Sequence, residues 1–92
     1  MAKRAVLDEW AAKFLGEDAD SVTDAVGAEW YTTSPGAAFV VLNKAASEGH
    51  RVELEMEGGE VSIECGGTEV EGDVEDLAEL IVQVCYDCYN NG

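Results

Sequence analysis

Polar and apolar residues alternate along residues 51–73, which read RVELEMEGGEVSIECGGTEVEGD. A period of two is typical of a β-strand with one buried face and one exposed face. Two diglycine pairs, Gly58-Gly59 and Gly66-Gly67, interrupt the alternation, and both glycines of a pair can adopt the positive φ angles of a two-residue hairpin turn. The pattern therefore predicts an antiparallel β-meander of three strands.

The two turns also fix which residues lie opposite one another. With two-residue turns, Glu57 faces Glu60 and Cys65 faces Thr68. One face of the sheet is then mostly apolar and is expected to pack against the core, with the rows Val52, Cys65, Thr68; Leu54, Ile63, Val70; and Met56, Val61, Gly72. The opposite face has the rows Glu53, Glu64, Glu69; Glu55, Ser62, Glu71; and Glu57, Glu60, Asp73. In these acidic rows only Ser62 is uncharged, and no basic residue interrupts them.

The amino-terminal part of the chain shows helical periodicity. Residues 3–15 place apolar side chains at helical spacing and are followed by Gly16, a residue typical of a helix C-terminus. Residues 20–30 predict a second, shorter helix with an N-cap at Asp20 or Ser21. We therefore expect one or two helices before residue 31.

Residues 35–49 fit two interpretations. Pro35 suits the first position of a helix and Gly49 suits the position after its end. Phe-Val-Val at residues 39–41 suits a strand instead. The terminal signals favour a helix by a narrow margin, and a strand over residues 36–43 would give the sheet a fourth member.

Residues 74–89 predict a final helix that begins after an N-cap at Asp73. Its apolar stripe should lie on the apolar face of the sheet; the stripe consists of Val74, Leu77, Ala78, Ile81, Val84, Cys85 and Cys88. The predicted fold class is therefore α+β, a single domain over residues 1–92. It has an antiparallel β-meander of three or four strands, a C-terminal helix packed on the apolar face, and one to three N-terminal helices.

A second stripe on the final helix, formed by Val82, Tyr86 and Tyr89, points away from the sheet. Aromatic side chains in such a stripe can anchor a homodimer or receive another helix of the same chain. We favour packing within the chain, in which case Trp10 and Phe14 of the first helix should contact the stripe.

Charge is distributed unevenly along the chain, whose formal net charge is −15. Residues 1–51 hold eight acidic and all five basic residues, whereas residues 52–92 hold twelve acidic residues and no basic one. Such a surface repels nucleic acid and anionic membranes and attracts a basic protein groove. The chain shows no signal peptide, and its apolar runs are too short to cross a bilayer. We therefore expect a soluble cytoplasmic protein with a cationic protein partner, no direct contact with nucleic acid and no membrane.

The acidic rows suggest what that partner recognises. Alternate side chains on one strand lie roughly 6.6 to 6.8 Å apart and neighbouring strands roughly 4.8 Å apart, while phosphates on a DNA strand are spaced by about 3.4 Å. A grid of carboxylates with these spacings can stand in for a run of phosphates. We therefore expect the partner-binding residues to be Glu53, Glu55, Glu57, Glu60, Glu64, Glu69 and Glu71.

In size, charge and acidic sheet the chain resembles the small phage-encoded DNA-mimic inhibitors, although it matches no sequence motif of theirs. That group includes anti-restriction proteins, anti-CRISPR proteins and uracil-DNA glycosylase inhibitor. The resemblance implies a viral protein that inhibits a DNA- or RNA-binding enzyme by occupying its basic channel. It also implies fast association that weakens as salt rises.

Two other interpretations of the acidic residues stay open. Runs of charge are often simply solvated faces of a sheet. An acid-rich and lysine-poor surface is also typical of halophilic proteins, in which molar salt screens the repulsion. The chain could on this view be a salt-adapted structural or interaction domain of archaeal or viral origin.

The thiols and the single histidine offer a further alternative. Cys85 and Cys88 lie on one face of the final helix, whose last turn should come near Cys65 and His50. Three cysteines and one histidine could form a tetrahedral zinc site and so stabilise an interaction module. Buried, inert thiols are the favoured interpretation. His50 has no positioned nucleophile beside it, so we expect a protein that is not an enzyme and needs no cofactor.

Overall fold

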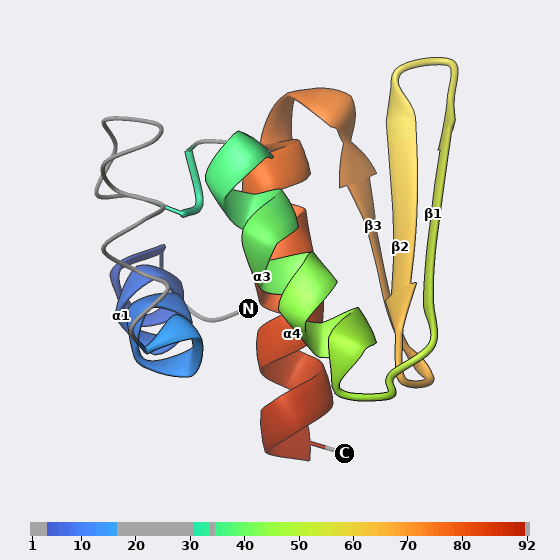
Figure 1. Cartoon of the computed structure of the whole chain (residues 1–92). Helices are drawn as coiled ribbons and strands as arrows, with labels where there is room; N and C mark the ends of the chain where they lie inside the picture. Colours follow the sequence, from blue (N-terminus) through green and yellow to red (C-terminus); the bar gives the residue numbers. More distant parts are fainter. Residues whose placement is uncertain (1–3, 17–30, 34, 92) are drawn as a thin grey trace.

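The computed structural model describes residues 4–16, 31–33 and 35–91 of the 92-residue chain (Figure 1). Its elements are α1 (Arg4–Leu15), α3 (Pro35–Ser47), β1 (Val52–Glu57), β2 (Glu60–Cys65), β3 (Thr68–Asp73), a 3₁₀ turn η1 (Val74–Asp76) and α4 (Leu77–Asn91). The α+β prediction is confirmed, and residues 36–43 belong to a helix. The helix predicted over residues 20–30 lies outside the described residues.

The three strands form one antiparallel sheet in the order β1-β2-β3. Every predicted cross-strand pair is present, from Glu57 opposite Glu60 to Cys65 opposite Thr68. Both glycines of each turn have positive φ, 59° and 83° at Gly58-Gly59 and 58° and 89° at Gly66-Gly67. These angles suit a two-residue turn whose twist matches that of the strands, so the turns hold the register.

Helix α4 is the centre of the molecule (Figure 1). It lies across β2 and β3 on one side and contacts α1 and α3 on its other sides. Its buried residues therefore surround the helix axis and do not follow one stripe; they are Ala78, Leu80, Ile81, Val82, Gln83, Val84, Cys85 and Cys88. Asp73 precedes η1 as expected, but its side chain makes no capping hydrogen bond.

Two expected core positions are exposed. Val74 is 40 % exposed because it lies in η1, before α4 begins its passage over the sheet. Met56 is 56 % exposed because α4 covers β2 and β3, while β1 lies at the sheet edge beyond it. The apolar face of the sheet is therefore closed over two strands and partly open over the third.

The aromatic stripe of α4 receives α1, as predicted. The ring of Trp10 meets Tyr86 edge-on at a centroid distance of 5.7 Å, and Phe14 lies 4.7 Å from Tyr89. Val82 is fully buried. The stripe of Val82, Tyr86 and Tyr89, for which a homodimer was the alternative interpretation, thus packs against α1 of the same chain.

Two polar contacts fasten α1 to the rest of the fold. The backbone N–H and the hydroxyl of Thr32 donate to the two carboxylate oxygens of buried Asp8, at 2.8 and 3.1 Å. The Lys44 ammonium donates to the carbonyl of Phe14 at 2.8 Å, which satisfies an acceptor in the last turn of α1. None of the helices in the described part of the chain has the length and apolar character needed to cross a lipid bilayer.

Candidate functional site

The candidate site is the acidic grid, defined as the outward-facing residues of the three strands. Its three rows are Glu53, Glu64, Glu69; Glu55, Ser62, Glu71; and Glu57, Glu60, Asp73. These residues alternate along each strand with residues directed at the helices, and none of the described helices covers this face (Figure 1). All seven glutamates predicted to bind a partner therefore lie on one open surface.

The ladder pattern determines how closely the carboxylates approach. The N–H of Gly66 donates to the carbonyl of Arg51 at 2.9 Å, so these two opposite residues form a hydrogen-bonded pair. Hydrogen-bonded and non-hydrogen-bonded pairs alternate along β1 and β2, and Glu53 with Glu64 is therefore also a hydrogen-bonded pair. The N–H of Val74 donates to the carbonyl of Gly59, so Glu64 and Glu69 form a non-hydrogen-bonded pair. Such pairs bring Cα atoms to about 4.5 Å, against about 5.5 Å for hydrogen-bonded ones. Glu64 therefore has a glutamate on each side, the closer one on β3.

No base lies within the rows, but one reaches the grid from its edge. The guanidinium of Arg51, the residue before β1, pairs with the carboxylate of Glu53 on β1. Both side chains are largely exposed, so the pair neutralises one corner of the grid without adding much stability. Lys13 pairs instead with Glu9 on α1, and Lys44 is held at Phe14. The other glutamates of the grid have no ion pair within the part of the chain that the structure describes.

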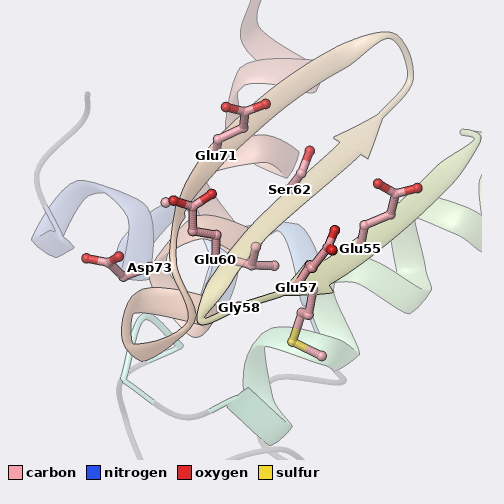
Figure 2. Close-up of a pocket in the computed structure, with 10 residues that line it drawn as sticks. Glu55, Glu57, Gly58, Glu60, Ser62, Glu71 and Asp73 are labelled. Carbon is pink, nitrogen blue, oxygen red and sulfur yellow. The ribbon is translucent and has the colours of Figure 1, made fainter.

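A hollow of about 1040 Å³ lies at the Gly58-Gly59 end of the grid (Figure 2). Glu55, Glu57 and Glu60 line it together with Glu71 and Asp73. Figure 2 shows several of these carboxylates projecting from the same side of the hairpin. Met56 and Val61, which belong to the apolar face, also line it, so the hollow lies at the end of the sheet where the two faces meet.

The sequence predicted that three thiols and the histidine converge, and they do. The Cys88 sulfur lies 3.6 Å from Nδ1 of His50, and Cys65 contacts both other cysteines. Burial raises the pKa of Cys65 to about 11, with a further contribution from Cys88, and burial raises the pKa of Cys85 still more. A raised pKa keeps a thiol protonated and unreactive at neutral pH.

A zinc site gains no support from this cluster. Within residues 4–16, 31–33 and 35–91, no set of three or more His, Cys, Asp or Glu side chains is arranged to hold a metal ion. The close packing of the thiols and His50 accounts for the glycine at position 66. A Cβ there would lie 2.7 Å from the Cys88 sulfur and 3.0 Å from Nδ1 of His50.

Two features of the site escaped the sequence analysis. Arg51 has the same strand parity as Glu53, so extending the alternation by one step would have placed it on the acidic face. The exposure of Met56 depends on where α4 crosses the sheet, for which no local sequence signal exists.

Comparison with known proteins gives no guide to the partner. No protein-family model, curated protein or solved structure matches this chain. The function is therefore inferred from the geometry of the site alone.

Proposed function

We propose that the acidic grid binds the nucleic-acid channel of a basic protein and blocks it by imitating a polyanion. The observation that supports this proposal most directly is the register, which gathers seven glutamates on one uncovered face of a three-stranded sheet. On this proposal the protein inhibits by binding and does not act as an enzyme. Its targets would be cytoplasmic DNA- or RNA-binding enzymes of defence or repair, as for anti-restriction, anti-CRISPR and repair-inhibitor proteins.

The energetics of the grid favour a binding role over a merely solvated face. Like charges directly opposite each other destabilise a sheet by up to roughly 1 kcal/mol per pair. Alternating lysines and glutamates would avoid this cost, yet among the described residues only Arg51 offsets it. Lysines and arginines lining a nucleic-acid channel would relieve the repulsion on binding, so the energy held in the unbound sheet favours association.

The test compares two variants of equal net charge. In the first, Glu53, Glu64 and Glu69 are replaced by glutamine; in the control, Glu9, Glu48 and Glu75, which lie off the grid, are replaced in the same way. Proteins captured from a host lysate on the immobilised native chain are eluted with salt and assayed for DNA or RNA binding. We expect the native chain and the control to compete with nucleic acid, and the grid variant to lose competition. Equal competition by both variants, or none by the native chain, would refute the proposal.

Salt adaptation predicts a different behaviour. A halophilic protein loses its fold in dilute buffer, because its surface charges are no longer screened. We expect this chain to keep its circular dichroism spectrum in dilute buffer. Unfolding there, reversed by molar salt, would favour the halophilic interpretation.

A further inference from the structure

The outer edge of β1 pairs with no other strand of the described sheet. We propose that it accepts an extended segment of the partner as a fourth strand, one in which lysine or arginine alternates with apolar residues. This inference rests on the proposed function, in that it takes the partner to be cationic, and it adds how the partner binds. Strand addition to a free edge is a common mode of peptide recognition, in which backbone bonds give affinity and alternate side chains give specificity.

The backbone of β1 has unused hydrogen-bonding groups on this side. In the ladder with β2, the hydrogen-bonded positions of β1 are the odd-numbered ones, because Arg51 accepts from Gly66 and the pattern repeats every second residue. The N–H and C=O groups of Val52, Leu54 and Met56 therefore point away from β2. No described element lies beyond this edge, as Figure 1 shows for β1.

The side chains of the same three residues are incompletely covered. Val52 and Leu54 are half-buried, and Met56 is 56 % exposed. An added strand would place its apolar residues beside these side chains, on the face where α3 contacts β1. The added strand would thereby extend the apolar face of the sheet at β1, which α4 does not cover.

The opposite face decides which strand fits. Residues of an added strand that neighbour Glu53, Glu55 and Glu57 would lie on the acidic face. Within the described residues, Glu53 is the only one of these three carboxylates that has an ion-pair partner. Lysine or arginine at these positions gives favourable cross-strand pairs. A second copy of β1 would instead bring glutamates against glutamates, which is a recognised means of blocking edge-to-edge association. Charge complementarity therefore favours a basic strand over a second copy of the chain.

The test uses the full chain and a capped peptide, Lys-Val-Lys-Val-Lys-Val-Lys, as the probe. The control peptide has the same composition with its four lysines grouped before the valines. We expect the alternating peptide to bind at least about tenfold more tightly than the control, and hydrogen exchange to slow at the amides of Val52, Leu54 and Met56. Equal affinity for both peptides, or protection confined to other amides, would overturn the edge proposal while leaving the acidic grid as a binding surface.

A matched pair of variants isolates the backbone contribution. Met56→Pro removes one outward N–H and a largely exposed side chain, whereas Met56→Ala removes only the side chain. We expect the proline variant to bind the peptide about tenfold more weakly than the alanine variant. The same loss is expected when the native chain meets a peptide N-methylated on the amides that face β1, which requires no change in the protein. Undiminished binding of the methylated peptide, or self-association of the native chain through β1 in sedimentation experiments, would refute the proposal. Failure of the proposed function has a different signature, since it would appear as equal competition by the two glutamine variants.

Discussion

Glu64 of β2 faces Glu69 of β3 across a non-hydrogen-bonded pair, the closer of the two pair geometries in an antiparallel sheet. Glu64 also lies opposite Glu53 on β1. Glu64 thus has a like charge on each side, at the closer separation toward β3 and at the wider separation toward β1.

Glu64→Gln should stabilise the protein. The substitution relieves two cross-strand repulsions, each worth roughly 0.2 to 1 kcal/mol, and the gain should be smaller on the side where Arg51 already pairs with Glu53. Glu55→Gln is the matched control, since Glu55 lies opposite Ser62. Urea denaturation in low salt measures both free energies of unfolding. A gain for Glu55→Gln as large as that for Glu64→Gln would show that total charge, and not cross-strand pairing, is responsible.

Gly66→Ala should destabilise the fold more than Gly58→Ala. The two glycines have nearly the same φ, 58° and 59°, so the backbone strain of an alanine, about 1 to 2 kcal/mol, should be common to both. A Cβ at residue 66 additionally meets the Cys88 sulfur at 2.7 Å, whereas residue 58 has open space. The difference between their unfolding free energies therefore measures the packing of the thiol cluster. Equal losses would mean that Cys88 and His50 can move aside freely.

Stability should fall as the pH rises above about 9. The pKa of Cys65 is raised from 9.0 to about 11, mainly by burial, and that of Cys85 is raised further. The folded chain therefore retains protons that the unfolded chain releases, so the stabilisation is complete below pH 9 and is lost progressively toward pH 11. Urea midpoints measured across this range should decline, and Cys65→Ala should make the decline shallower. A flat profile in the native chain would contradict the buried, protonated state of these thiols.

Asp8→Ala should destabilise the protein by about 2 to 4 kcal/mol, because it leaves the buried N–H and hydroxyl of Thr32 without their acceptor. Thr32→Ala removes only the hydroxyl bond and should cost less. A double-mutant cycle by urea denaturation should give a coupling energy between the two residues. Strictly additive losses would show that the hydrogen bonds between Asp8 and Thr32 contribute nothing measurable.

The sheet could be predicted almost completely from the sequence, because its determinants are local. Two-residue turns at Gly58-Gly59 and Gly66-Gly67 leave one register, and that register places each glutamate on a face. The contact of Trp10 with Tyr86 was also foreseeable, since the second stripe of α4 needed a cover.

What could not be predicted depends on tertiary placement. Met56 matches the alternation as well as Val61 does, yet it is exposed because α4 crosses the sheet over the other two strands. Asp8 has the sequence character of a surface carboxylate, yet it is buried and accepts hydrogen bonds from Thr32, which is 24 residues away in the chain. No sequence motif specifies the partner, because repeated glutamates define a pattern of charge and do not identify the protein that binds it.

The position of α4 at the centre of the fold also bears on how the protein is made. Every other described element precedes α4 in the chain, and α1, α3 and the sheet all pack on it. During translation these earlier segments leave the ribosome without the surface that they are built to cover. The nascent chain should therefore stay open to chaperones and proteases until residues 77–91 emerge, and then close in a single late step.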